Sequence, residues 1–418
     1  MIIIKIVIFI YLIATFSPLI TYVLEKKYKQ KIKTQKIKKY LDIYVLLPCY
    51  KEQKIVNDTI NWFKQFKYKG KIKFIMITTE KEESKKSFDL TTKDLIQKKL
   101  NKLKDKRFVN IHYPYIEGNK SSQMNYALDI LKENINDNAY ISVFDFDSRP
   151  SLDTFDNLNK VYYLKNEPDV INQVPLNIQN FEEISKKNIL MIIYTLQHLV
   201  RSIAIEKLKL LLCSLRRFKI PQYCMGACMH IKYSTLKDNN FFPIFVDDLT
   251  LGYRLSIKGS RFAYLPSLNL NLIYNDIKNY INSSTLIFKG ISTYLSEIKN
   301  IKGYFIGKVK MFIFGSLNII EFILIPVVFL IIYVLSLLKL KLNILSFIAI
   351  LIPILWSISS LCVIKYNKIK FNLLNTIIAI LLSPIWFIFR PLGFLSYFIK
   401  KLKSILFKSN IEYKKTER

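Results

Sequence analysis

The stretch that decides the fold reads Tyr140-Ile141-Ser142-Val143-Phe144-Asp145-Phe146-Asp147-Ser148-Arg149-Pro150. Its first five residues are apolar or small, and turn-forming residues stop them, so we expect a buried strand that ends at a loop. Ligands of open α/β sheets bind at the carboxyl ends of the strands. Two carboxylates at such an end can share a divalent cation that also holds a diphosphate. A D-x-D pair arises by chance about once in a chain of this length, so its surroundings decide its meaning.

Strand-like and helix-like segments alternate on both sides of this stretch. Short apolar runs predict strands at residues 43–47, 72–77, 108–111 and 141–144. Helical patterns at residues 55–66 and 92–103 separate the first three strands, and another at residues 122–131 leads into the fourth. Such alternation implies parallel pairing and a doubly wound sheet, so the fold class is α/β. We assign residues 41–275 to one soluble domain of ordinary size.

The charge of the chain points to a membrane rather than to nucleic acid. Its 418 residues carry a formal net charge of +32, a balance typical of proteins that bind nucleic acid or an anionic membrane surface. The apolar content of 51% and the mean hydropathy of +0.19 favour the membrane. No nucleic-acid motif accompanies the charge, so we expect no nucleic-acid partner.

The cysteines indicate a reducing environment. Five cysteines, an odd number without framework spacing, favour reduced thiols in a cytosol-facing domain. Cys224, Cys228 and His230 could form half of a zinc site. No second ligand pair follows them and the local alternation is that of a strand, so a role in the core is the stronger interpretation.

An apolar segment precedes the domain. Residues 1–24 are long enough to cross a hydrocarbon core of ~30 Å. We interpret them as an uncleaved anchor rather than a signal peptide, because no small-residue cleavage site precedes Glu25. The basic juxtamembrane linker, residues 25–40, should stay inside by the positive-inside rule. The catalytic domain would then be cytoplasmic, on an integral protein of the plasma (inner) membrane, with membrane lipids as partners.

The carboxyl-terminal part also favours a membrane. Residues 276–310 are amphipathic and dotted with lysine, as interfacial helices are. Residues 311–399 contain about three apolar stretches long enough to span, at 311–338, 342–364 and 371–399, and residues 400–418 form a basic tail. Three crossings would leave this tail outside, whereas its charge favours the inside. Arg390-Pro391 could end the last span or mark a re-entrant turn, so the side of the tail stays open.

Polar residues stand at several predicted strand ends and helix starts. After the first strand, Pro48, Tyr50 and Glu52 could offer a ring and an acceptor to a nucleobase, although an ordinary loop is the alternative. Lys120 lies beside the start of the helix at residues 122–131, a position that suits a phosphate, with a solvated cap as the alternative.

A pair of carboxylates marks another predicted helix start. Asp247 and Asp248 lie within the segment Val246-Asp247-Asp248-Leu249-Thr250-Leu251-Gly252-Tyr253-Arg254-Leu255. The helix dipole favours acidic residues at this position, and one of them is suited to general-base work on a hydroxyl. Helix capping is the alternative.

The order of these elements decides between the alternatives. Four motifs follow one another along the chain: P-x-Y-x-E, K-x4-N-x-A-L, D-x-D and D-D-x3-G-x-R-L. Their order and spacing resemble those of the membrane-bound family 2 glycosyltransferases. This group includes cellulose, hyaluronan and poly-N-acetylglucosamine synthases and ceramide glucosyltransferase. Residues 226–236 resemble a further family element, with Lys232 where arginine is usual. Of the ten glycines, four fall on these motifs: Gly118, Gly226, Gly252 and Gly259.

The resemblance implies a GT-A (Rossmann-like, mostly parallel) domain with α-helical transmembrane segments. It implies that Asp145 contacts the nucleoside diphosphate, that Asp147 with Asp145 holds Mg²⁺ or Mn²⁺, and that Asp248 is the catalytic base. Pro48, Tyr50, Glu52 and Lys120 would frame the nucleotide.

Two departures from the family pattern matter. Thr78-Thr79-Glu80 stands where the family commonly has D-D-x-S, so the acidic contact to uracil is absent or comes from Glu80. The [Q/R]-x-x-R-W motif is missing, and residues 283–290 stand in its place. Its absence argues against a processive polymer channel.

Three hypotheses follow for the function. The first is an inverting transfer from a nucleotide-diphospho-sugar, expected to be UDP-linked, to a hydroxyl of a lipid-linked or glycan acceptor. The second keeps the fold and transfers the sugar to a polyprenyl phosphate, a nucleophile that needs no base. The third is a non-catalytic nucleotide-binding membrane scaffold, which we disfavour because the carboxylates at 145, 147, 247 and 248 are all present.

Overall fold

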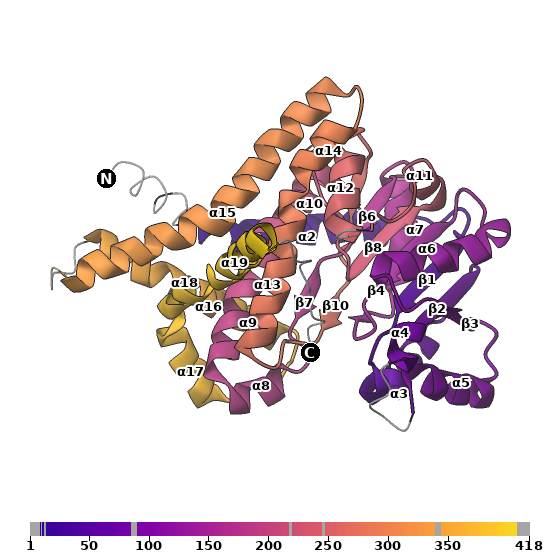
Figure 1. Cartoon of the computed structure of the whole chain (residues 1–418), viewed down its shortest axis with the longest axis horizontal. Coiled ribbons are helices and arrows are strands. Elements are labelled where there is room, and N and C mark those ends of the chain that lie inside the picture. Colours follow the sequence, from indigo (N-terminus) through magenta and orange to yellow (C-terminus); the bar gives the residue numbers. More distant parts are fainter. Residues whose placement is uncertain are drawn as a thin grey trace.

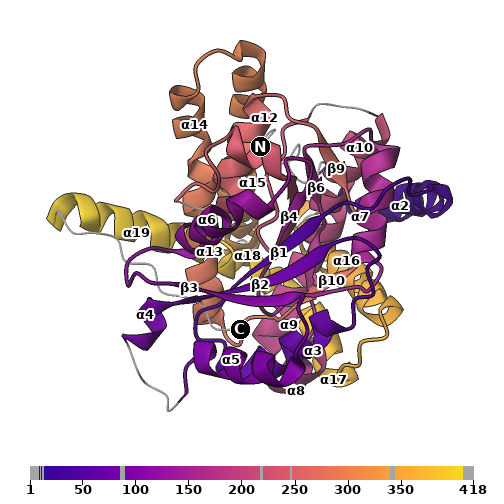
Figure 2. The same cartoon turned by 90° about the vertical axis from the view of Figure 1, so that its right-hand side faces the viewer.

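The structure is a computed structural model of the chain. It describes residues 9, 11, 14–84, 90–216, 220–244, 247–338 and 344–407. Residues 1–8, 10, 12 and 13 of the predicted anchor at residues 1–24 lie outside the described residues, as do residues 408–418 of the basic tail. Figures 1 and 2 show a sheet-bearing part on one side of the molecule and long helices on the other.

A parallel-rich sheet forms the centre of the sheet-bearing part. In the described part of the chain it has seven strands in the order β3-β2-β1-β4-β8-β6-β9, and only β8 runs against the others. The strands are β1 (Ile43–Pro48), β2 (Ile72–Thr79), β3 (Phe108–Tyr113), β4 (Tyr140–Phe144), β6 (Val170–Asn172), β8 (Cys228–Lys232) and β9 (Phe262–Tyr264). The predicted α/β class with a mostly parallel sheet is confirmed, because the four strands expected from the apolar runs pair in parallel.

The alternation along β1 explains how both faces of the sheet are covered. Ile43, Val45 and Leu47 pack with α3 and α7, whereas Tyr44 and Leu46 pack with α6 and α12. Successive side chains of a strand point to opposite faces, so a wholly apolar strand requires helices on both. Figure 2 shows α6 on one side of the sheet and α3 and α5 on the other. The helices named here and their neighbours are α3 (Val56–Lys64), α4 (Glu80–Glu83), α5 (Thr92–Leu103), α6 (Lys120–Leu131), α7 (Thr154–Leu164), α11 (Tyr233–Lys237) and α12 (Asp247–Ile257).

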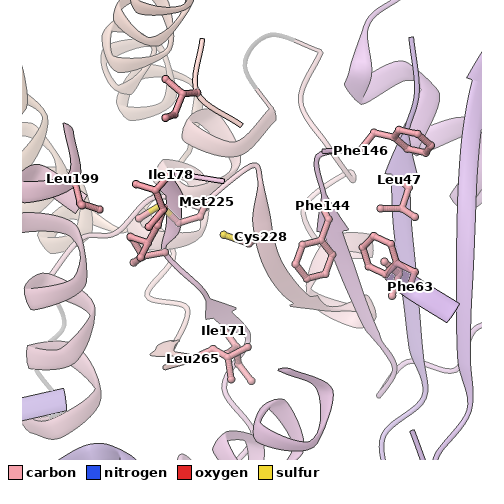
Figure 3. Close-up of a cluster of buried hydrophobic side chains, with 14 of the residues drawn as sticks. Leu47, Phe63, Phe144, Phe146, Ile171, Ile178, Leu199, Met225, Cys228 and Leu265 are labelled. Atoms are coloured by element: carbon pink, nitrogen blue, oxygen red, sulfur yellow. The ribbon is translucent and has the colours of Figure 1, made fainter. Parts of the chain in front are cut away.

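Aromatic rings fill the core next to the D-x-D segment. Phe144 at the end of β4 lies 6.0 Å from Phe63 of α3, centroid to centroid, and Figure 3 shows the two rings turned toward one another. Phe146, the middle residue of D-x-D, is 2% exposed and lies next to Leu47. The burial of this ring anchors the segment that carries both aspartates.

A second, three-stranded sheet and a long helix connect this domain to the remaining helices. The small sheet has the order β5-β10-β7, formed by β5 (Arg149–Pro150), β10 (Asn269–Asn271) and β7 (Pro175–Asn177). The short helix α8 (Phe181–Lys187) then leads into α9 (Ile189–Arg201), a π-helical segment (Ser202–Lys207) and α10 (Leu208–Arg216). This long helix packs beside α2 (Ser17–Thr34), whose Tyr28 and Ile32 are buried.

Three described helices are long and apolar enough to cross a membrane: Ile189–Leu215, Phe305–Leu335 and Ser346–Tyr366. The first lies inside the predicted soluble domain, where the sequence predicts no span, and 72% of its 18-residue apolar window is buried inside the protein. A fourth candidate is the pair Leu373–Leu381 and Ser383–Ser404, bent by 57°. The bend comes at Leu382, directly before Ser383-Pro384 and before the Arg390-Pro391 break that the sequence suggests.

The helices of the carboxyl-terminal part complete the list of elements. They are α13 (Ile277–Ser292), α14 (Tyr294–Asn300), α15 (Phe305–Leu338), α16 (Ile344–Tyr366), α17 (Leu373–Leu381), α18 (Trp386–Phe389) and α19 (Leu392–Phe407). α13 packs along α19, and α9 packs along α16 and α17, so the middle of the sequence reaches into this bundle.

Candidate active site

The D-x-D segment follows β4 and is held rigidly on both sides. Thr59 of α3 donates to the carbonyl oxygen of Phe146 at 2.8 Å, and Arg149 donates to the same oxygen at 3.3 Å. The amide of Ser148 donates to the carbonyl oxygen of Asp145 at 2.9 Å. Asp145 lies at the carboxyl end of a central strand, where ligands of such sheets bind.

Asp147 faces the small sheet. It is 6% exposed, and its Oδ2 accepts a hydrogen bond from the amide of Leu272, just after β10, at 3.1 Å. Asp147 also lies near the guanidinium of Arg149, whose pKa is lowered by burial and raised again in part by this carboxylate. The structure therefore places the two aspartates of the motif in different surroundings.

Lys120 joins Asp145 to a distant part of the chain. It is the first residue of α6, and its Nζ lies 2.8 Å from Asp145 Oδ1 and 3.0 Å from the carbonyl oxygen of Gly226. The Asn119–Ser122 capping box fixes the start of this helix. Lys120, whose charge Asp145 balances here, and the first amides of α6 are the donors in this corner that suit a diphosphate.

Gly226 also joins this corner to Asp248. Its amide donates to Asp248 Oδ2 at 3.0 Å, and the amide of Leu249 donates to Asp248 Oδ1 at 2.7 Å. A Cβ on Gly226 would lie 2.5 Å from Asp248 Oδ2, so only glycine allows this approach. Both carboxylate oxygens thus receive a backbone donor that stabilises the negative charge and fixes its position. The side chain of the neighbouring Asp247 lies outside the described residues.

The remaining residues of the D-D-x3-G-x-R-L motif hold α12 in place. A Cβ on Gly252 would come within 2.3 Å of the Tyr223–Cys224 backbone, so this glycine lets the helix pack directly against the segment before Gly226. Arg254 pairs with Glu297 of α14 at 3.1 Å and donates to the carbonyl oxygen of Asn239 at 2.8 Å. These contacts are structural and orient Asp248.

Asn125 of the K-x4-N-x-A-L motif holds the chain segment that precedes α12. Its amide group donates to the carbonyl oxygen of Phe242 at 2.9 Å and accepts from the amide of the same residue at 3.0 Å. The motif therefore has two roles. Lys120 contacts the D-x-D aspartate, and Asn125 positions the segment that leads to Asp248.

The loop after β1 is held in place by Glu82, a residue that belongs to none of the motifs found in the sequence. Pro48 ends β1, and Tyr50 and Glu52 follow it in the loop. The buried carboxylate of Glu82 accepts a hydrogen bond from the amide of Lys51 at 2.6 Å. The backbone of Lys51 has a φ of 57°. Glu82 also accepts from the amide of Thr92 at 2.7 Å, at the start of α5. It thereby joins this loop to α4 and α5.

Glu80 is paired rather than isolated. Its Oε2 lies 2.9 Å from Nε2 of His112, whose Nδ1 lies 3.1 Å from the hydroxyl of Thr78. The three residues come from the carboxyl ends of the adjacent strands β2 and β3. Glu80 is thus oriented by a neighbour that the sequence alone could not identify.

The site residues gather in one region around the end of β4. Burial raises the pKa of the Cys228 thiol well above its usual range, and its charged neighbours include Asp145, Lys120 and Asp248. These three groups therefore lie near the start of β8, which pairs with the end of β4. Cys228 and His230 both lie in β8, and His230 is buried with its Nδ1 2.8 Å from the hydroxyl of Ser142.

A divalent ion would need ligands beyond the protein here. No group of three or more His, Cys, Asp and Glu side chains suited to a metal gathers within the described ranges. Asp145 and Asp147 supply hard carboxylate oxygens, the donors that Mg²⁺ and Mn²⁺ prefer. Mg²⁺ is commonly bound by one or two carboxylates together with phosphate oxygens, so this donor set fits an ion that arrives with a diphosphate.

Comparisons with known proteins agree with the fold. No family model matches the sequence, and no curated protein sequence matches it. Among solved structures, the chain is similar to the mannosyltransferase PcManGT from Pyrobaculum calidifontis in complex with GDP-Man and Mn²⁺. The TM-score is 0.53 at 12% sequence identity, and the match covers 97% of this chain and 100% of that chain. The chain therefore has the mixed α/β fold, with a parallel-rich sheet, of a glycosyltransferase.

Proposed function

We propose that the protein is a membrane-bound inverting glycosyltransferase of the family 2 type that uses a nucleotide-diphospho-sugar. The observation that carries the proposal is the junction at Gly226, which connects Lys120 and Asp145 to Asp248. Lys120 is 106 residues from Gly226 in the sequence, so local structure does not explain their meeting. A cation, a strand-end carboxylate and a backbone-held carboxylate at one place are what transfer from a diphosphate leaving group requires.

Each group has a role in this proposal. Lys120 and the start of α6 bind the diphosphate, and Asp145 orients the lysine and the nucleoside. Asp147 and Asp145 hold the divalent ion, which when bound neutralises the leaving diphosphate. The nucleobase is framed by Pro48, Tyr50, Glu52 and Glu80. The GDP-Man in the similar mannosyltransferase supports the donor class, while UDP remains our prediction for the nucleotide.

Asp248 is the proposed base. It would take the proton from an acceptor hydroxyl as that oxygen attacks the anomeric carbon and the bond to the diphosphate breaks, with inversion. Base catalysis of this kind contributes about 10²–10⁴-fold to rate. The alternative acceptor, a polyprenyl phosphate, is already a nucleophile and would need no base.

We propose that the catalytic domain is cytoplasmic and that the apolar helices insert in the plasma (inner) membrane. The lysine-rich residues 25–40 support this side by the positive-inside rule.

The experiment is a nucleotide-sugar screen with the detergent-solubilised protein, with and without Mn²⁺, followed by Asp248→Asn. We expect donor turnover that depends on Mn²⁺, and a loss of about 10²–10⁴-fold in the variant with unchanged nucleotide affinity. Asp238→Asn, at an exposed aspartate after α11, is the matched control. Absence of turnover with every donor would refute the enzyme proposal, and normal turnover by Asp248→Asn would favour the phosphate acceptor.

A further inference from the structure

A small cavity lies where the long helix of the domain meets the carboxyl-terminal bundle. Its volume is about 70 Å³, and α9, α13, α15, α16 and α18 all contribute to its wall. Figures 1 and 2 show α9, α13, α16 and α18 gathered on the helical side of the molecule. A water needs roughly 10–15 Å³ of such space, so the cavity has room for about five waters. That is enough for a phosphate group and too little for a nucleotide-sugar.

Two arginines line this cavity. Arg390, after α18, lies 3.0 Å from Glu321 of α15, and Arg201, at the end of α9, lies 3.5 Å from Glu206. Glu206 is also 3.0 Å from Lys209. Among the described residues that line the cavity, two arginines accompany one carboxylate, Glu321, so positive charge exceeds negative charge in the wall. Charged side chains within apolar helices are costly and are kept where they bind something.

The backbone at Arg201 is unusual. A π-helical segment begins directly after it and runs from Ser202 to Lys207. Such widened turns are rare and occur frequently at functional sites, because the extra residue reorients the side chains around it. The local geometry therefore supports a specific role for Arg201 beyond helix packing.

Aromatic rings form much of the remaining wall. The rings of Tyr194, Tyr280 and Trp386 form a cluster with centroid separations of 4.9, 5.0 and 5.6 Å. Trp356 of α16 lies on another side and donates from its indole N–H to the hydroxyl of Thr15 at 3.1 Å. An apolar wall with a few convergent charged groups is typical of a ligand pocket. Arginine is the residue best suited to a phosphate.

Two chain segments link the wall of the cavity to the candidate active site. Tyr274 lines it and follows, by two residues, Leu272, whose amide binds Asp147. Two residues span at most about 7 Å. α13 contributes Ser283 to the wall, and just beyond its end the hydroxyl of Thr293 lies 3.0 Å from that of Thr250, two residues after Asp248. The backbone therefore joins the cavity wall closely to the Leu272 contact with Asp147, and α13 joins it at a longer distance to the segment of Asp248.

We infer that this cavity binds the phosphate of a lipid-linked acceptor, with Arg201 and Arg390 as its ligands. The inference rests on the proposed glycosyltransferase function where it identifies the lipid as an acceptor. The phosphate site itself is argued from the geometry of the cavity. The apolar helices around the cavity provide the surface along which the lipid chain lies. Glu321 pairs with Arg390 and would compete with the phosphate for this arginine.

The tryptophans allow a binding test that needs no turnover. Two of the three tryptophans, Trp356 and Trp386, line the cavity, and Trp62 lies in α3 of the domain. In a Trp62→Phe background, geranyl phosphate, geraniol and inorganic phosphate are titrated against the full chain in detergent. We expect geranyl phosphate to change the tryptophan fluorescence saturably. Geraniol and inorganic phosphate should each bind at least about tenfold more weakly, because each lacks one of the two recognised parts.

Variants separate binding from folding. Arg201→Gln and Arg390→Gln should each weaken the binding of geranyl phosphate by about tenfold or more. Arg261→Gln, on the surface of the sheet domain, should leave this binding unchanged. Glu321→Gln should tighten binding, a direction that loss of structure would not produce. Equal binding of geraniol, equal binding of inorganic phosphate, or affinity unaffected by both arginine variants would each overturn the inference. If arginine-dependent binding persists while no donor is turned over, the glycosyltransferase proposal fails and the cavity assignment stands.

Discussion

Gly226→Ala tests the junction that joins the candidate site. The new Cβ would lie 2.5 Å from Asp248 Oδ2 and 2.9 Å from its Cγ, whereas ordinary van der Waals contact begins at 3.4 Å. The Asp248 side chain cannot simply rotate away, because its other oxygen is held by Leu249. The carboxylate or the Gly226 segment must therefore move by about 0.9 Å. A displacement of about 1 Å at a catalytic group can cost ~10²-fold in rate.

The assay measures transfer and unfolding together. With the donor identified by the nucleotide-sugar screen, we expect the Gly226→Ala rate to fall by about 100-fold. Overpacking should lower the free energy of unfolding by about 1–3 kcal/mol. The control is Gly259→Ala, where φ is +82° and no atom lies within 4 Å of the new Cβ. Backbone strain should cost the control about 1 kcal/mol without slowing transfer.

The two variants together decide the interpretation. A Gly226→Ala protein with a normal rate would refute the reasoning, since Asp248 would then not need its present position. A slow Gly259→Ala protein would show that rate follows stability rather than the geometry at Asp248.

Three further predictions concern other parts of the site and the core. Asp147→Asn should abolish Mn²⁺-dependent nucleotide binding, measured by calorimetry with and without metal, and unchanged affinity with metal would contradict its role. Glu82→Gln should weaken nucleotide binding by about tenfold, because one of the two oxygens that accept from the Lys51 and Thr92 amides becomes an NH₂ donor; equal affinity would show that the loop is held otherwise. Burial lowers the pKa of His230 to about 3, so the unfolded state binds more protons below pH ~6.5 and stability is lost as the pH falls toward 3. Between pH 7.5 and 5 the wild type should lose about 2 kcal/mol more than His230→Gln in unfolding experiments, and equal losses would contradict this.

Local patterns in the sequence predict most of the sheet. Residues 43–47, 72–77, 108–111 and 141–144 correspond to β1 to β4 within two residues. A buried parallel strand is a short apolar run that needs no distant partner to be recognised. The turn chemistry after β4 placed Asp145 and Asp147 at a strand end for the same reason. The short strands β6, β9 and β10 have three residues each, too few for a period to show.

The sequence by itself determined the α/β class, the D-x-D at a strand end and the apolar segments after residue 310, because these depend on periodicity and composition along a few neighbouring residues. Only the tertiary structure decided which groups meet. Gly226, Glu82 and His112 act through contacts over long sequence separations, which carry no local signal. The helix Ile189–Leu215 lies in the bundle because its apolar surface packs on α16 and α17, and this packing places Arg201 and Arg390 on the wall of one cavity.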